Sequence, residues 1–249
     1  MEFLIVCPLA FIAGLVDAIA GGGGLIALPA FFFAGLPAHA AIATSKLSST
    51  MGTSLVTIRY ALSGYMVKHY VIVGVVCGLA GSFLGSNVVL LTDSFALMVF
   101  MLISLPFVAW LVFKTKDLDT FAKTPLPQRK ALAITALIAL CIGVYDGFYG
   151  PGTGTILMLL LTMLAHQSTK EAQGTAKAIN LATNISALSV FLISGNVVVV
   201  LGLVAGLFNI AGGWIGTSLF KKKGSGIVRP FMMVVIVLFA IKLIVDIAA

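Results

Sequence analysis

Two lysines stand out because each interrupts a long apolar stretch, Lys46 within residues 38–62 and Lys177 within residues 170–194. Each lies about eight residues from the end of its stretch, a depth of roughly 12 Å along a helix. An ionised side chain at such a depth in a membrane is costly and generally marks a substrate or ion pathway. A buried ammonium group of this kind could attract an anion.

Neutral hydrogen-bonding side chains accompany both lysines at helical spacing. Their positions i, i+3 and i+7 put them on one face of a helix. The two stripes are Lys46, Ser49 and Thr53, with Ser45 beside them, and Lys177, Asn180 and Asn184. A cation with a ladder of neutral side chains suits an oxyanion, so we predict a substrate-binding role for all seven. The alternative is hydrogen bonding between helices, with each lysine reaching toward the membrane surface.

Two glycine tracts form the second element of the predicted site. They contain Gly22, Gly23 and Gly24 in the first half of the chain, and Gly152, Thr153 and Gly154 in the second. Glycine disfavours a continuous helix, so the chain should break there. A helix restarting at Leu25 or Thr155 would aim free N–H groups and a positive dipole end at a bound anion. Glycines placed for close helix packing are the alternative.

Asp17 and Asp146 immediately precede these tracts. Carboxylates there could form ion pairs with the lysines, carry a coupling proton, or hold the broken loop through backbone hydrogen bonds. We predict a gating or coupling role. No spacing of Cys, His or carboxylates indicates a metal site, and no cofactor motif is found, since Ile26 stands where GxGxxG requires its last glycine.

The composition determines which elements position these residues. Of 249 residues, 60% are hydrophobic and 9% are charged, whereas soluble domains carry about 25% charged residues. This predicts an all-α integral membrane protein, with the lipid bilayer as its surroundings. About ten apolar segments are expected, at residues 3–20, 24–35, 38–62, 70–91, 94–113, 131–149, 154–165, 170–194, 196–219 and 227–247.

The two halves of the chain resemble each other. GLVDAIAGGGG at 14–24 aligns with GVYDGFYGPGTG at 143–154, and TSK ending at Lys46 aligns with TAK ending at Lys177. We therefore predict two five-segment repeats, residues 1–113 and 131–249, joined by a polar linker at 114–130. Five is odd, so the repeats should be inverted in the membrane, with glycine-broken or re-entrant helices.

Basic residues occupy alternate connections, which by the positive-inside rule places the 114–130 linker in the cytoplasm and both termini outside. Their distribution over several connections also argues against a nucleic-acid partner, despite the formal charge of +7. Four Gly-x-x-x-Gly motifs, such as Gly81 with Gly85 and Gly212 with Gly216, predict helix contacts.

The stretch GLVDAIAGGGGLIALPAFFFAGLPAHAAIATSK, with GFYGPGTGTILMLLL and GTAKAIN in the second half, resembles the sulfite exporter TauE/SafE family. The resemblance covers nearly the whole chain. It implies a transporter, not an enzyme, in the bacterial cytoplasmic membrane, carrying small sulfur-containing or carboxylate anions such as sulfite, sulfoacetate or other sulfonates. Pro151 departs from two-fold equivalence of the tracts.

Together these features predict a secondary transporter that works by alternating access around a site near mid-membrane, with export as the expected direction. It should need no cofactor, and its oligomeric state is open. Two alternatives remain at this point: a passive anion channel, and a membrane-embedded enzyme, for which the sequence offers no nucleophile paired with a base.

Overall fold

The structure is a computed structural model that describes residues 2–97, 100 and 126–223. The helices assigned within these residues are α1 (Glu2–Ala20), α2 (Gly24–Phe33), α3 (Ala38–Leu62), α4 (Lys68–Leu91), α6 (Gln128–Phe148), α7 (Thr153–Met163), α8 (Thr169–Ile193) and α9 (Val199–Lys223). They match eight of the ten predicted segments. The predicted segment at 227–247 and most of that at 94–113 lie outside the described residues, so the count of ten stays a prediction.

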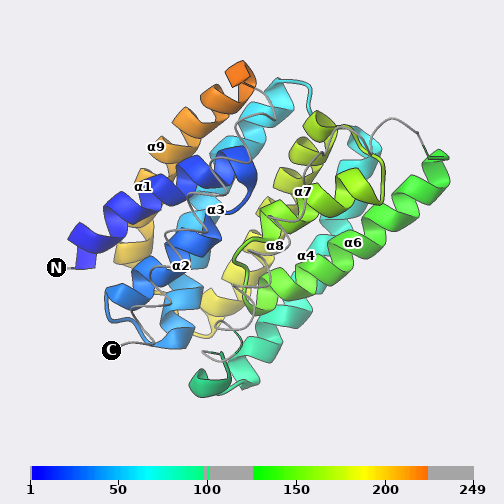
Figure 1. Ribbon diagram of the computed structural model, residues 1–249. Helices are drawn as coiled ribbons and strands as arrows, with labels where there is room; N and C mark the ends of the chain where they lie inside the picture. The colour runs from blue at the N-terminus through cyan, green and yellow to red at the C-terminus, as the bar shows by residue number, and fades with distance from the viewer. Residues whose placement is uncertain (1, 98–99, 101–125, 224–249) are drawn as a thin grey trace.

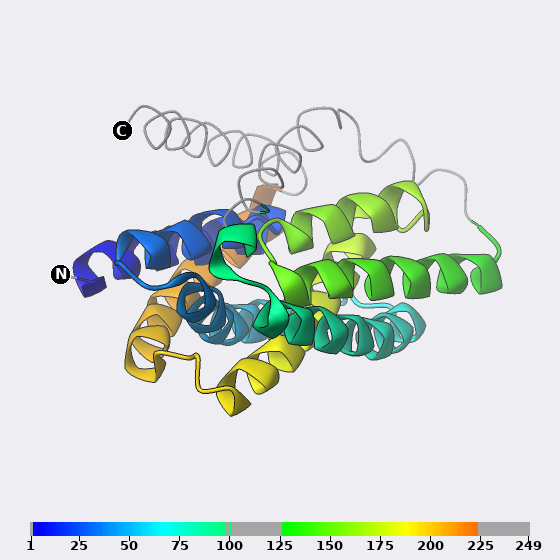
Figure 2. The same cartoon turned by 90° about the horizontal axis from the view of Figure 1, so that it is seen from below.

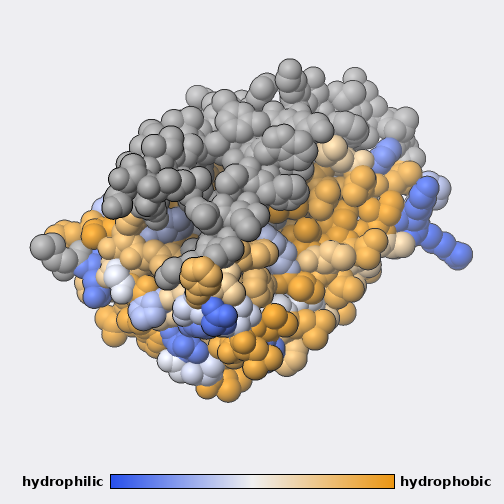
Figure 3. All heavy atoms as spheres, turned by 60° about the horizontal axis from the view of Figure 1, so that its bottom comes forward, coloured by the Kyte–Doolittle hydropathy of each residue, from blue (hydrophilic) through white to orange (hydrophobic). Residues whose placement is uncertain are grey.

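Five of the described helices are long and apolar enough to cross a membrane, namely α1, α4, α6, α8 and α9. Helix α3 has 25 residues but carries the Ser/Thr-rich stretch around Lys46, which lowers its hydrophobicity. Large apolar side chains such as Leu62, Leu91 and Ile193 are almost fully exposed, and apolar residues cover much of the described surface in Figure 3. Such a surface suits contact with lipid rather than with water.

The glycine tracts break two helices into hairpins. Helix α2 packs beside α1 and runs back toward the end of the bundle where α1 begins, and α7 does the same beside α6 (Figures 1 and 2). Helix α1 begins at one end of the bundle and α6 begins at the other. This opposite sense is what an inverted repeat requires. The order of helices, long, short, long and long in each half, supports the predicted repeat as well.

Close packing between the halves runs along glycines. Helix α4 packs against α6, and α9 packs in the corresponding way against α1. A Cβ atom on Gly81 or Gly85 would clash with backbone oxygens of α6, and one on Gly212 or Gly216 would clash with those of α1. These predicted helix-contact motifs are confirmed. They bring the two hairpins to the centre of the bundle, where the polar residues lie.

Candidate functional site

A small cavity lies where the two helix breaks meet, with a volume of about 30 Å³. This is room for roughly two water molecules. Most of the predicted site residues line the cavity: Asp17, Gly24, Ser45, Lys46, Ser49, Thr53, Asp146, Thr153, Gly154, Asn180 and Asn184. They come from both halves of the chain, so the folded protein brings the two predicted stripes to one place.

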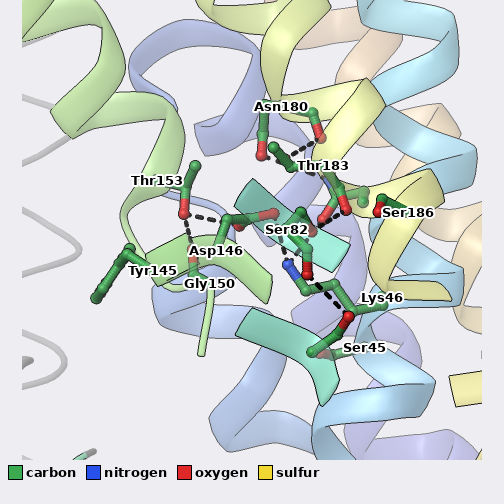
Figure 4. A network of polar contacts seen from close by, with 12 residues as sticks. Ser45, Lys46, Ser82, Tyr145, Asp146, Gly150, Thr153, Asn180, Thr183 and Ser186 are labelled. Atoms are coloured by element: carbon green, nitrogen blue, oxygen red, sulfur yellow. Dashed lines mark hydrogen bonds and ion pairs between the residues drawn. The ribbon is translucent and has the colours of Figure 1, made fainter. Parts of the chain in front are cut away.

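Lys46 is the cation of the cavity. Its Nζ lies 2.8 Å from Asp146 Oδ2 at the end of α6 and donates a hydrogen bond of 3.1 Å to Asn184 Oδ1 on α8. Thr153 is the first residue of α7, and its Oγ1 donates to Asp146 Oδ1 at 2.7 Å. Figure 4 shows Lys46 pointing toward Asp146, with Thr153 beyond it. Lys46 is 3% exposed and Asp146 1% exposed, so the pair is shielded from bulk solvent.

Lys177 forms a second ion pair, with its Nζ 2.7 Å from Asp17 Oδ2 at the end of α1. A capping box between Ser168 and Glu171 starts α8 at Thr169 and thereby fixes Lys177 about two turns into the helix. Unlike Lys46, Lys177 is fully buried and lies outside the cavity lining. Only its partner Asp17 reaches the cavity.

The two ion pairs cross between the halves. Lys46 of the first half meets the carboxylate before the second glycine tract, and Lys177 of the second half meets the carboxylate before the first tract. Each pair therefore ties a helix break to the middle of a long helix in the other half. Breaking a buried pair by removing one partner generally costs about 3–5 kcal/mol, because a charge is left uncompensated.

The glycine tracts form one wall of the cavity by direct backbone contact. Thr155 N donates to Gly21 O at 3.2 Å, and Thr155 Oγ1 donates to Ala20 O at 2.7 Å. Gly21 and Gly154 approach so closely that a Cβ atom on either would overlap the other's backbone. A Cβ atom on Gly150, whose φ is +99°, would lie 2.8 Å from Lys46 Nζ. Glycine is required at these positions because the two backbones approach closely and because Gly150 has a positive φ that other residues rarely adopt.

The expected donors at the helix starts need correction. The N–H groups of Leu25 and Thr155 are already used, because they donate to Gly22 O and Gly21 O. The N–H groups of Gly24 and Gly154, one residue earlier, have no acceptor among the described residues. Both glycines line the cavity, as does Gly150, whose N–H also has no acceptor among the described residues. The helices restart at Gly24 and Thr153, slightly earlier than predicted.

Other residues differ from the predicted set. Gly22, Gly23 and Gly152 lie outside the cavity lining, whereas Gly21, Leu28, Tyr149, Gly150 and Pro151 belong to it. Gly21 and Gly150 could have been found in the sequence, because they align with each other across the two tracts. Leu28 and Tyr149 carry no such signal, since an apolar or aromatic residue beside a helix break is ordinary in a membrane helix.

The cavity offers a ligand one cation and several neutral hydrogen-bonding groups. Within the part of the chain that the structure describes, no group of three or more His, Cys, Asp or Glu residues could hold a metal ion. Two lysines and two carboxylates make this cluster formally neutral. Ser, Thr and Asn side chains complete the cavity, together with the backbone of the two glycine tracts. Charge-assisted hydrogen bonds from Lys46 would be the strongest contacts available to a ligand.

Comparison with known proteins identifies the family. The family model described as Sulfite exporter TauE/SafE matches residues 6–243. A probable membrane transporter protein of a Sinorhizobium species is 33% identical over 250 residues, which cover 99% of this chain and 93% of the relative. A probable membrane transporter protein of Haemophilus influenzae is 31% identical, with 95% and 92% covered. The probable membrane transporter protein YfcA of Escherichia coli is 30% identical, with 95% and 87% covered.

No solved structure matches the chain. The family match and the relatives nevertheless extend over nearly the whole sequence, including both glycine tracts and both lysines. They agree with the several apolar helices of the structure in indicating a multi-pass membrane protein and a transporter rather than an enzyme. The chain therefore belongs to the sulfite exporter TauE/SafE family of membrane transporters.

Proposed function

We propose that this protein is a secondary transporter of small sulfur-containing anions, such as sulfite, sulfoacetate or other sulfonates. The observation that carries the proposal is the central cavity, which has one buried cation, Lys46, and neutral donors from both halves of the chain. Such a site, formed where two corresponding helices are broken, is the arrangement found in many secondary transporters. Substrate would bind at Lys46 near mid-membrane.

The geometry of the cavity favours an oxyanion over an uncharged solute. Asn184 already accepts from Lys46, and its amide NH2 group lies 3.5 Å from Asn180 Oδ1, so these side chains form a polar wall. Ser49 and Thr53 line the cavity on the α3 side. A sulfonate or sulfite group presents several oxygens to donors on both walls at once. A carboxylate would offer fewer.

Transport would proceed by alternating access, with the two halves rocking or gating around the site. The crossed ion pairs are the natural gate, because Asp17 and Asp146 each connect one half to the other. Opening toward one side of the membrane would have to loosen at least one of these contacts. This gives both aspartates a gating role in addition to their structural one.

The membrane orientation belongs to the same proposal. Lys170 lies over the ring of Tyr65, and Phe220 packs against Tyr65, so the ends of α3, α8 and α9 with their basic residues meet at one end of the bundle. We assign this end to the cytoplasm of a bacterial inner membrane, with both termini outside. An inside-negative potential would then favour export of an anion, by about 2.3 kcal/mol per charge per 100 mV.

The test is transport by the purified protein in liposomes loaded with labelled sulfite, sulfoacetate, thiosulfate, sulfate, acetate or chloride. We expect saturable exchange of one or more sulfur-containing anions, with accumulation against a gradient of the exchanged anion. Lys46→Met should abolish it, whereas Lys170→Met, which removes a lysine at the end of the bundle, should not. Flux without saturation or accumulation would indicate a channel instead, and release of a chemically altered product an enzyme.

A further inference from the structure

The two ion pairs differ in what an incoming anion could replace. Lys46 lines the cavity, so a bound anion can contact its Nζ in place of the Asp146 carboxylate. Lys177 is fully buried outside the lining, so an anion in the cavity cannot take the place of Asp17. The carboxylate of Asp146 thus occupies the position of a substrate anion, while that of Asp17 does not.

The contacts of Asp146 fit this exchange. Its Oδ2 atom contacts Lys46 Nζ and has no other hydrogen-bond donor among the described residues. Its Oδ1 atom accepts from Thr153 Oγ1, a neutral hydroxyl. Once an anion took over Lys46, Asp146 would keep a single neutral donor. Its negative charge would then be buried next to a second negative charge, which is strongly unfavourable.

We propose that Asp146 takes up one proton when an anion binds at Lys46, so that the protein binds anion and proton together. This rests on the proposed function of the same cavity. The proton comes from water on the side to which the cavity is open and adds to a carboxylate oxygen of Asp146. Without it, an anion would add its full charge to a cluster of two lysines and two carboxylates that is neutral beforehand.

The surroundings of Asp146 identify it as the group that takes the proton. The titratable or charged groups near it are Lys46 on α3, Asp17 across the cavity, and Tyr145 and Tyr149 beside it in sequence. Helices α7 and α8 contribute neutral groups to the lining, such as Thr153 and Asn184. A proton on Asp17 would leave Lys177 as an uncompensated buried cation, whereas a proton on Asp146 leaves Lys46 paired with the anion.

The consequence for transport depends on the charge of the substrate. A dianion such as thiosulfate would cross with one proton and still move one net negative charge. The membrane potential would therefore continue to favour its exit. A monoanion would cross as a neutral complex, and the pH difference across the membrane would enter its driving force instead.

The experiment measures proton uptake when the detergent-purified protein binds sulfoacetate or thiosulfate, both fully ionised between pH 6 and 8. A pH-indicator dye in weakly buffered solution reports the protons, and thermal shift reports the binding. We expect one proton per bound anion and an apparent affinity that rises up to about tenfold for each unit fall in pH. Asp146→Asn should bind the anion without proton uptake, and Asp146→Glu should restore the uptake.

Asp93→Asn is the control, because it removes an exposed carboxylate outside the cavity lining, and proton uptake should persist in it. Binding without uptake by the unmodified protein overturns the inference and leaves the proposed function standing. Uptake that persists in Asp146→Asn overturns the assignment to this residue. If neither anion binds the unmodified protein, the proposed function itself fails, and this inference with it. The number of protons taken up by the unmodified protein tests the inference even if a variant fails to fold.

Discussion

The two halves carry a lysine and an aspartate at corresponding positions, yet the surroundings of their lysines differ. Lys46 meets Asp146 at the edge of a cavity, while Lys177 is fully buried outside the cavity lining and pairs with Asp17, which does line the cavity. In the proposed site, a ligand can take the place of the carboxylate that pairs with Lys46 but not of the one that pairs with Lys177. The comparison teaches that similar sequences in the two halves can have different surroundings, because the packing around each lysine differs.

The largest difference is expected between two double variants that each remove one complete ion pair. Lys46→Met with Asp146→Asn should abolish the thermal shift produced by an anion, with binding weakened on the order of 100-fold, because the charge-assisted contacts are lost. Lys177→Met with Asp17→Asn should retain that shift. Each variant removes a lysine and a carboxylate, so neither leaves a buried charge uncompensated. Loss of binding in both would end the distinction between the pairs.

Single removal of Lys177 tests its structural role. Lys177→Met leaves Asp17 without its cation, and we expect stability to fall by about 3–5 kcal/mol. Adding Asp17→Asn to the same chain should recover most of that loss. Thermal unfolding of the purified single and double variants measures both steps. A single variant as stable as the parent would show that the second pair does not hold the halves together.

Two glycine positions separate backbone strain from contact with the cation. Gly150 and Gly152 both have positive φ, +99° and +82°, so alanine at either should cost about 1–2 kcal/mol in stability. Only Gly150→Ala would also press a methyl group against Lys46. We therefore expect anion binding to weaken in Gly150→Ala and to persist in Gly152→Ala. Equal losses of binding would mean that strain alone disturbs the site.

The smallest effect concerns a single hydroxyl. Ser49→Ala removes one neutral donor from the cavity and should weaken binding about twofold to tenfold, because one neutral hydrogen bond contributes about 0.5–1.5 kcal/mol. Ser189→Ala, at an exposed position where the hydroxyl bonds to Ile185 O, is the control and should change nothing. A loss in Ser49→Ala as large as in Lys46→Met would contradict the leading role of the charge.

Much of the helical layout followed from the sequence. The contrast between apolar segments and polar connections predicted the positions of the eight described helices. For example, α3 at Ala38–Leu62 coincides with its predicted segment. The internal similarity of the sequence aligns Asp17 with Asp146 and Lys46 with Lys177. Helical spacing placed Asn180 and Asn184 on one face, and both line the cavity. These features are local, so they are readable from periodicity and composition.

The contacts of the two glycine tracts could not be predicted from the sequence. Both were expected to offer N–H groups at Leu25 and Thr155, but Thr155 N bonds to the carbonyl of Gly21 in the other half. That contact depends on how closely two distant segments approach. Likewise, Pro151 enters the second tract, and α7 starts after a left-handed Gly152 whereas α2 starts after a right-handed Gly23. Pro151 is visible in the sequence, but only the folded arrangement shows the different backbone conformations before the two helices.

The sequence by itself determined that the chain is helical and suited to a membrane, and which polar residues interrupt its apolar segments, because lipid imposes a strong and local constraint on which residues may span it. The tertiary structure alone decided that each lysine pairs with the aspartate of the opposite half and that only Lys46 borders the cavity. Lys46 and Lys177 have similar local sequences but differ in their access to the cavity. The physical reason is that this access depends on neighbours more than 100 residues away in the chain.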